Sequence, residues 1–222
     1  MNDNQSAFNS SEYDRKIKQT LPYYDEFYKQ VIELVKTFHT SAIKWLDIGC
    51  GTGKMGSVAL ENIELEQFVF CDSSAEMIRI SEKQFHRPNT AFSVCNVQNL
   101  KYTNEFDVIT AIQVNHYLHI EERKAALKKC YASLKENGIF ITFENFSPFT
   151  GIGEKVYLEK WKRYQLKHGK SLEECNKHIE RYGKDYFPIT LEEHINLMRN
   201  SGFRVVEILW LSNMQVGLWG MK

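Results

Sequence analysis

The chain has 222 residues, 43% of them hydrophobic, which is enough for one large domain with a substantial core. Its 28 lysines and arginines balance its 28 aspartates and glutamates, and this neutrality argues against a dedicated nucleic-acid-binding protein, although a local basic patch is compatible with it. The five cysteines form no Cys-x-x-Cys pair and no run of 18 apolar residues occurs, so we expect a cytoplasmic protein without a structural metal, a disulfide framework or a membrane span.

Two helical patterns precede the first predicted strand. Residues 1–12 are polar and are predicted to be disordered, and helices are expected over 13–20 and 24–38. Apolar residues recur at helical spacing in the second of these helices, at Phe27, Val31, Leu34, Val35 and Phe38. We expect the segment 13–38 to act as a lid over a bound ligand.

Strands and helices then alternate across residues 40–145. Five strands are predicted in this segment, over 43–48, 67–71, 91–95, 106–111 and 139–144. The remaining predictions are a turn over 135–138 and helices over 54–61, 75–85 and 121–134. Apolar strands separated by helices indicate βαβ units, which form a parallel sheet with right-handed crossovers.

The alternation stops after the fifth strand. Residues 146–187 are rich in charged and aromatic residues and are predicted to form a helical cap over the sheet. Residues 188–222 are predicted to contain a helix over 191–201 and strands over 203–211 and 215–221, which are close enough to pair as a hairpin. We expect all of these segments to form a single domain.

A glycine-rich loop follows the first strand, with the sequence Asp47-Ile48-Gly49-Cys50-Gly51-Thr52-Gly53. Glycine lets the backbone turn sharply and approach a ligand, and the N-terminus of the next helix lies beside the same ligand. Residues 51–56 also fit the G-x-G-x-x-G pattern of dinucleotide-binding enzymes, which is a weak indication when it stands alone. We favour S-adenosylmethionine (SAM), because Asp47 can bind the ammonium of that cofactor and would gain nothing beside a pyrophosphate.

A second acidic residue supports nucleoside binding. Asp72 ends the second strand, 19 residues beyond Gly53, where a carboxylate can accept two hydrogen bonds from a ribose diol. Both cofactors carry such a ribose, so Asp72 does not choose between them. The alternative role for Asp72 is to cap the helix that begins near Ser74.

These motifs resemble those of the class I SAM-dependent methyltransferases. The loop over 47–53 matches their first motif, Asp72 matches their ribose acid, and Asn96 stands where many members carry an aspartate that contacts the adenine amine. The resemblance implies an α/β, Rossmann-like fold with a seven-stranded mixed sheet, in the order 3-2-1-4-5-7-6 with strand 7 antiparallel. It also implies that SAM contacts Tyr24, Asp47, Gly49, Gly51, Gly53, Asp72, Ser73, Met77, Asn96, Val97, Ile112 and Gln113.

A narrower resemblance covers the N-terminal helices, the cap and the tail of the chain. It is to bacterial proteins often labelled tRNA wobble-uridine oxyacetate methyltransferases, a branch that is similar to the carboxy-SAM synthases. In the helix before the pair that matches Gly202-Phe203, the synthases carry an arginine that binds the extra carboxylate of their cofactor. Leu197 stands in that place here, and Arg199 lies on a different side of the helix, which favours ordinary SAM.

Residues that could act on a methyl acceptor follow strands four and five, where open α/β sheets bind their ligands. His116 could take a proton near neutral pH, or it could only pack between strand and helix. Glu144 could accept a proton or neutralise an amine, or it could form a salt bridge with the cap. Both are therefore catalytic candidates, and acceptor contacts are predicted for Asn115, His116, Tyr117, Glu144, Trp161 and Tyr164.

The predicted cap also carries a run of basic residues, which includes Lys155, Lys160, Lys162, Arg163 and Lys167. These side chains could bind phosphate, as in RNA, or an anionic small molecule. Glutamates are interleaved with them, which favours a solvated helix face. No RNA-binding module accompanies the basic run, so we expect a small-molecule partner and either a monomer or a homodimer.

The residues and the resemblance together predict an enzyme that transfers a methyl group from SAM to a nitrogen, oxygen or sulfur atom of a small molecule. Three alternatives stay open at this point. The first is a tRNA-modifying methyltransferase, and the second is a non-methylating SAM enzyme related to the carboxy-SAM synthases. The third is a SAM-binding module without catalysis.

Overall fold

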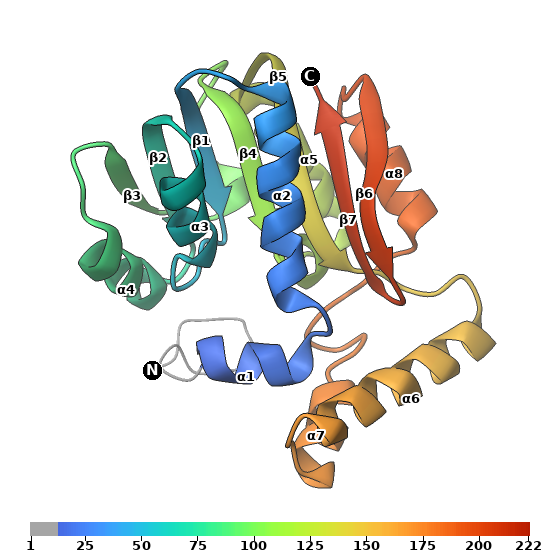
Figure 1. Cartoon of the computed structure of the whole chain (residues 1–222). Coiled ribbons are helices and arrows are strands. Elements are labelled where there is room, and N and C mark those ends of the chain that lie inside the picture. The colour runs from blue at the N-terminus through green and yellow to red at the C-terminus, as the bar shows by residue number, and fades with distance from the viewer. Residues whose placement is uncertain (1–12) are drawn as a thin grey trace.

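Seven strands form one sheet in the computed structural model, which describes residues 13–222 (Figure 1). The strands are β1 (Ile43–Ile48), β2 (Leu65–Asp72), β3 (Thr90–Val94), β4 (Phe106–Ile112), β5 (Leu134–Asn145), β6 (Val205–Ser212) and β7 (Gln215–Met221). Their order across the sheet is β3-β2-β1-β4-β5-β7-β6. β1 to β5 run parallel, whereas β7 pairs antiparallel with both β5 and β6. The predicted strand order and the antiparallel seventh strand are confirmed, and the disorder predicted for residues 1–12 falls outside the described residues.

The described residues also form helices on both sides of this sheet. They are α1 (Tyr13–Thr20), α2 (Tyr24–Phe38), α3 (Lys54–Asn62), α4 (Ala75–Phe85), α5 (Ile120–Ser133), α6 (Gly151–Lys167), α7 (Leu172–Ile179) and α8 (Leu191–Asn200), with short 3-10 turns η2 (Val97–Asn99) and η3 (Asn115–Tyr117). Outside the cap, the predicted helices begin and end within one residue of these bounds. None of the helices in residues 13–222 combines the length and hydropathy that a membrane crossing requires.

Successive strand residues point to opposite faces of the sheet, so the sheet separates two apolar cores. Trp45 and Phe143 lie in the core that α2 and α3 cover, whereas Leu46 and Phe140 lie in the core that α5 and α8 cover. Right-handed crossovers produce this arrangement, because the chain moves across the sheet in one direction from β1 to β3 and in the other from β4 to β5. Figure 1 shows the two helical layers with the sheet between them.

The turn predicted over 135–138 is wrong, because β5 begins at Leu134 and includes these residues. The pairing of β4 with β5 shifts its register there, between Phe106 opposite Leu134 and Val108 opposite Ile139. Asn137 adopts a φ of 64° at this point, in the left-handed region that asparagine enters more readily than most residues. β5 therefore carries three more residues than β4 between these two pairs, a larger irregularity than the one-residue insertion of a β-bulge.

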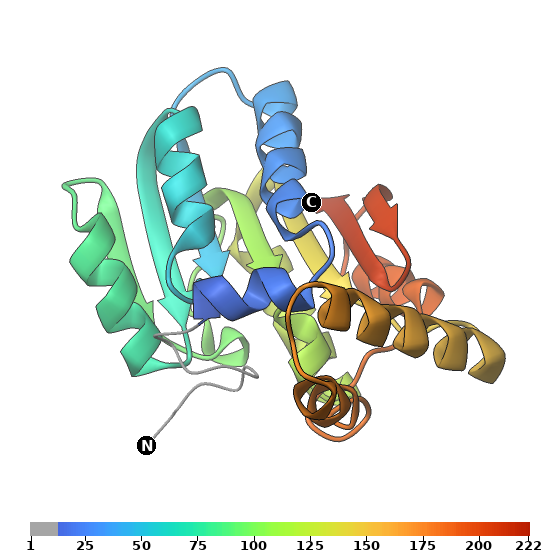
Figure 2. The same cartoon turned by 60° about the horizontal axis from the view of Figure 1, so that its bottom comes forward.

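α1, α6 and α7 lie beyond the carboxyl ends of the parallel strands (Figures 1 and 2). Two aromatic side chains tie α6 to the end of α1. The Trp161 Nε1 donates to the Thr20 carbonyl at 2.6 Å, and the Tyr164 hydroxyl donates to the Lys18 carbonyl at 3.1 Å. The helical cap thus lies at the edge where open parallel sheets bind their ligands.

Gly56 of α3 offers a test of how tightly this helix packs on the sheet. A Cβ built on Gly56 would overlap Cε1 and Cζ of Phe70, whose ring is stacked between Phe85 and Phe92 and cannot turn away. We therefore expect Gly56→Ala to lower the free energy of unfolding by about 1–3 kcal/mol, the usual cost of overpacking. Urea denaturation measures this change.

The control is Gly151→Ala in the first turn of α6, where nothing lies within 4 Å of the added Cβ. Alanine is the better helix former, so this variant should be as stable as the parent or slightly more stable. If both variants unfold at the same urea concentration, α3 does not pack on Phe70 as described.

Candidate active site

The loop after β1 is held against the end of β2. Gly49 and Gly51 have φ values of 63° and 55°, which glycine adopts without the steric cost that a Cβ imposes. A Cβ on Gly49 would overlap Val114, whereas nothing lies within 4 Å of a Cβ on Gly51. The Gly51 amide donates to Asp72 Oδ2 at 2.9 Å. The loop therefore presents bare backbone beside the Asp72 carboxylate.

A cavity of about 640 Å³ opens beside this loop, and we call it the cofactor cavity. Most of the predicted cofactor contacts line it, namely Gly49, Gly51, Asp72, Ser73, Met77, Asn96, Val97, Ile112 and Gln113. Gly53 is not among the lining residues, and a Cβ there would overlap the ring of Phe85. Gly53 therefore permits core packing of α4, and its predicted contact with the cofactor is not supported by its position.

Asp72 joins two loops at the wall of this cavity. Its Oδ2 accepts from the Gly51 amide, and its Oδ1 accepts from the Ser74 amide at 2.8 Å. The N-cap of α4 is Ser74, whose hydroxyl accepts from the Met77 amide at 3.1 Å. The capping role considered for Asp72 thus belongs to Ser74, and Asp72 is left to fix the glycine loop and to face the cavity.

Asp47 lies deeper, at the end of β1, with only 2% of its surface exposed. Thr110 Oγ1 donates to Asp47 Oδ1 at 2.7 Å, and Trp45 Nε1 donates to Thr110 Oγ1 at 2.9 Å. Burial raises the pKa of the Asp47 carboxyl to about 7; the Thr110 hydrogen bond opposes this shift and the charge of Asp72 adds to it. Asp47 can therefore change its protonation near neutral pH.

A small recess of about 20 Å³ connects Asp47 with the N-terminal helices. Tyr24, Tyr28 and Lys54 line it together with Asp47, Gly49 and Gly51. The Tyr28 hydroxyl donates to the Tyr24 hydroxyl at 2.6 Å. The predicted site residues Tyr24 and Asp47 are thus brought together, in a recess that offers a carboxyl group, two phenol groups and one ammonium group.

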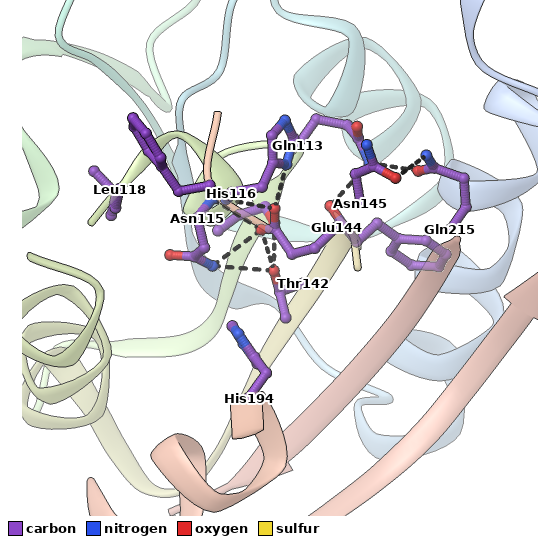
Figure 3. A network of polar contacts seen from close by, with 12 residues as sticks. Gln113, Asn115, His116, Leu118, Thr142, Glu144, Asn145, His194 and Gln215 are labelled. Atoms are coloured by element: carbon purple, nitrogen blue, oxygen red, sulfur yellow. Dashed lines mark hydrogen bonds and ion pairs between the residues drawn. The ribbon is translucent and has the colours of Figure 1, made fainter. Parts of the chain in front are cut away.

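Glu144 is the centre of a buried polar network, shown in Figure 3. Its Oε1 accepts from the Asn115 amide and side chain, both at 3.0 Å, and from Thr142 Oγ1 at 2.7 Å. Its Oε2 accepts from the His116 amide at 3.1 Å and contacts His116 Nδ1 at 2.7 Å. Burial opposes ionisation of this carboxyl, but the hydrogen bonds from His116, Thr142 and Asn115 lower its pKa to about 2.

This geometry changes the interpretation of both catalytic candidates. Glu144 is 0% exposed and both of its oxygens are occupied, so it is placed to act through His116 and not to contact an acceptor. The bond from Nδ1 to a carboxylate fixes the histidine tautomer and leaves Nε2 as the acceptor of a proton. His116 and Asn115 are also buried, whereas the neighbouring Tyr117 lines the cofactor cavity.

Gln113 stands at the boundary of the cofactor cavity in an unusual conformation. Its φ is 60°, which is uncommon for a residue with a Cβ. Its Nε2 donates to the Phe143 carbonyl at 3.2 Å and to Gln215 Oε1 at 3.0 Å, and Gln215 Nε2 donates to Asn145 Oδ1 at 3.2 Å (Figure 3). These three amides connect the ends of β4, β5 and β7.

A second cavity, of about 320 Å³, lies on the other side of Gln215, and we call it the cap cavity. It is lined by Pro22, Tyr23, Tyr157, Lys160, Trp161, Arg163, Tyr164, Lys167, Ser212, Asn213, Met214 and Gln215. The predicted acceptor contacts Trp161 and Tyr164 lie here, in the wall between α6 and the end of α1. The six predicted acceptor residues are therefore divided between a buried network and two cavities.

Thr110 and Gln215 were missed as site residues in the sequence. Thr110 is a single hydroxyl inside an apolar strand, and this was the available signal, because a buried polar side chain needs a partner. Gln215 had no comparable signal, since its partner Gln113 is 102 residues away in the chain.

Comparison with known proteins agrees with this geometry: residues 46–140 match the family model of a methyltransferase domain. This segment of the chain is therefore similar to a methyltransferase domain, and its sheet has the strand order expected from that resemblance. Phosphoethanolamine N-methyltransferase 2 of Haemonchus contortus, which shares this fold, was solved with S-adenosyl-L-methionine and with S-adenosylhomocysteine.

Relatives and solved structures extend the likeness to most of the chain. It is 24% identical over 205 residues to the carboxy-S-adenosyl-L-methionine synthase of Nautilia profundicola, with 92% of this chain and 88% of the relative covered. It is 26% identical over 203 residues to the synthase of Campylobacter lari, with 89% and 85% covered. A methyltransferase solved with the Haloferax volcanii Trm112 activator matches with a TM-score of 0.67 and 13% identity, over 96% of both chains. Phosphoethanolamine N-methyltransferase 2 of Haemonchus contortus matches with a TM-score of 0.64 and 15% identity, over 90% of this chain and 42% of that one.

The cofactor cavity has room for the adenosyl part of SAM, whereas the recess at Asp47 has room for about one water molecule and marks only the polar groups that face the methionyl end. The cofactor cavity falls in the usual size range of small-molecule sites and offers the Asp72 carboxylate to a ribose diol and apolar Met77 and Val97 to an adenine ring. The recess of Asp47 and Tyr24 offers a carboxyl to an ammonium and hydroxyls to a carboxylate. SAM supplies an electrophilic methyl group on a sulfonium, so the residues of the chain have mainly to bind, orient and exclude water.

The Glu144 network predicts acid sensitivity of the fold. The carboxylate has a folded-state pKa below its ordinary value of 4.5, so it stabilises the fold above pH 4.5, and this stabilisation is lost as the pH falls toward 2. We expect Glu144→Gln to remove that part of the pH dependence. Because the variant places an amide against several donors, it should also lower the free energy of unfolding at pH 7 by about 3–5 kcal/mol.

Urea denaturation between pH 3 and pH 7 measures both effects. The matched control is Glu207→Gln, an exposed glutamate on β6, which should follow the parent at every pH. Parallel pH profiles for the parent and Glu144→Gln would contradict the assignment of a buried, ionised carboxylate.

Proposed function

We propose that the protein transfers the methyl group of SAM to a nitrogen, oxygen or sulfur atom of a small molecule bound in the cap cavity. The observation that carries this proposal is the adjacency of the two cavities. Gln113 lines the cofactor cavity, Gln215 lines the cap cavity, and their side chains are hydrogen-bonded to each other. A single pair of amide side chains thus lies between an acceptor under α6 and the cofactor cavity, and in this proposal the pair must part before the two ligands reach attack distance.

The residues around this boundary have distinct roles in the proposal. Holding acceptor and cofactor at attack distance can supply about 7–11 kcal/mol of the barrier, and the cap and the lid helices do this work. His116, oriented by Glu144, stays the candidate base at Nε2, but its buried ring lines neither cavity, so an acceptor proton would have to reach it through a movement of the wall. The same proposal places the enzyme in the cytoplasm, where its five free cysteines stay reduced.

The names of the relatives favour a second candidate, synthesis of carboxy-SAM. The charge of the cofactor cavity argues for ordinary SAM instead. Its lining residues, all within the described part of the chain, include Asp72, Glu121 and Glu122 but no lysine or arginine that could pair with an extra carboxylate. Leu197 packs against a core, and Arg199 is exposed on α8.

Incubation with methyl-labelled SAM and a metabolite extract tests the proposal. We expect label in a low-molecular-weight product and formation of S-adenosylhomocysteine. The control is Asp72→Ala, which should weaken SAM binding by roughly 1.5–3 kcal/mol, the range for hydrogen bonds to a charged group, and reduce transfer accordingly. Label found only in tRNA would overturn the small-molecule acceptor, and a copurified cofactor with the mass of carboxy-SAM would favour the synthase.

The raised pKa of Asp47 predicts that cofactor binding releases a proton. Asp47 binds the cofactor ammonium as a carboxylate, so below pH 7 it must first lose the proton that burial favours. We expect the affinity for S-adenosylhomocysteine to rise from pH 5.5, to reach about half of its limit near pH 7 and to level off roughly one pH unit above that. Calorimetry at pH 6.5 in two buffers of different ionisation enthalpy measures the proton released.

The matched ligand is methylthioadenosine, which shares the adenosine part and lacks the ammonium group. It should bind without releasing a proton, and Asp47→Asn should abolish the release seen with S-adenosylhomocysteine. Equal proton release with both ligands would show that Asp47 does not contact the ammonium.

A further inference from the structure

We propose that the cap cavity takes an anionic aromatic molecule, with its negative group against Lys160, Arg163 and Lys167 and its ring against the tyrosines of the cavity wall. That this molecule is also the methyl acceptor rests on the proposed function. The preference for an anion rests on the cavity itself.

The charged side chains that line the cap cavity are all cationic. Lys160, Arg163 and Lys167 line it, and no aspartate or glutamate is among its lining residues in the described part of the chain. Their spacing of three and four residues places them on one face of α6, together with Tyr157 and Tyr164. Glu159 pairs with Arg163 Nε at 2.9 Å but does not line the cavity.

The basic run of α6 is largely exposed, as expected for a solvated helix face, but only part of it lines the cap cavity. The lysines and glutamates alternate in sequence, but the helix separates them in space. Lys155 and Lys162 are not among the lining residues, whereas Lys160 and Lys167 are. Two lysines, and an arginine that pairs with Glu159, surround about 320 Å³, which suits one small anion; an extended nucleic-acid strand would require a basic stripe that continues beyond the cavity.

Aromatic rings form the other part of the wall. Tyr23 is 62% exposed and has a φ of 60°, so a large ring is held toward solvent by a backbone conformation that is costly for tyrosine. Its ring contacts Trp210 edge-on at 5.8 Å between centroids. The Lys160 ammonium lies 5.5 Å from the ring centre of Tyr157. A ligand with a ring and a negative group would meet both kinds of contact together.

The turn between β6 and β7 closes the cavity and leads to the cofactor. Asn213, at φ 55°, accepts a hydrogen bond from Lys160 and so ties the turn to α6. Gln215 follows at the start of β7 and contacts Gln113 of the cofactor cavity. An anion bound to the cations of α6 would therefore reach toward the wall that the two cavities share.

Two fluorescent probes test the inference, because they differ in one charged group. 8-Anilinonaphthalene-1-sulfonate (ANS) is an aromatic anion, and N-phenyl-1-naphthylamine is its uncharged counterpart. Saturating S-adenosylhomocysteine keeps both probes out of the cofactor cavity. We expect ANS to bind more tightly than the uncharged probe, with an affinity that falls as salt screens the charges.

Two double variants decide whether ANS binds in the cap cavity. Lys160→Gln with Lys167→Gln removes two charges from the cavity wall, and Lys155→Gln with Lys162→Gln removes two charges at the same spacing from the same helix outside it. We expect the first to weaken ANS binding roughly fivefold, from the usual strength of partly exposed ion pairs, and the second to change it less than twofold. The uncharged probe should bind equally to both variants.

An equal loss of ANS affinity in the two double variants, or no loss in either, would overturn the inference. Displacement of ANS by tRNA at stoichiometric concentration would also overturn it, in favour of a nucleic-acid ligand. Unchanged binding of S-adenosylhomocysteine, measured by calorimetry, shows that each variant is folded. If ANS behaves as expected while no small molecule is methylated, the anion site stands and the proposed function fails.

Discussion

The organisation of the site depends on one buried carboxylate. Glu144, at the end of β5, accepts hydrogen bonds from the backbone amides of Asn115 and His116 and so fixes the chain as it leaves β4. The His116 carbonyl in turn accepts from the Phe187 amide at 2.6 Å, at the end of the cap. Since an unpaired charge at this depth would be strongly destabilising, the carboxylate requires this loop conformation. The cap and the cofactor cavity are thereby held in one arrangement.

The antiparallel hairpin at the end of the chain provides the second constraint. β7 lies between β5 and β6, so its first residue, Gln215, arrives beside Asn145 and Gln113. With a purely parallel sheet, the carboxyl end of the last strand would lie at this edge, and its N-terminal residue would lie at the opposite edge. The reversed direction of β7 therefore places the Gln215 side chain between the two cavities, where it bonds to Gln113 and to Asn145.

The fold could be predicted from the sequence because its signals are local. Apolar runs between helices indicated the parallel strands, and the glycine loop with Asp72 indicated where the cofactor cavity lies. The register shift around Asn137 was not predicted as part of β5, because asparagine and glycine there also suit a turn. The cap was predicted as helical, but the face of α6 that lines the cap cavity was not. Lysines and glutamates alternate along the helix, and this pattern does not show which face packs against the rest of the chain.

The site was predicted less completely, because its decisive contacts join residues far apart in the chain. Glu144 ends a strand and was a reasonable candidate base. Its two oxygens, however, are occupied by hydrogen bonds from Asn115, His116 and Thr142. Asp47 was expected beside an ammonium, yet the raised pKa that makes it responsive near pH 7 comes from burial and from the charge of Asp72, against the opposing hydrogen bond of Thr110. Neither property can be obtained without knowing which side chains surround the carboxyl group.

The two cavities also explain how a chain with no net charge can hold strong local fields. The cofactor cavity has only acidic charges among its lining residues and the cap cavity has only basic ones, within the described residues. A cationic cofactor suits the first, and an anion suits the second, so each ligand is attracted to its own cavity and repelled by the other. The amides of Gln113 and Gln215 between the cavities carry no net charge. Opposite charges on the two ligands would then attract each other across this wall, which favours the approach of the acceptor toward the sulfonium.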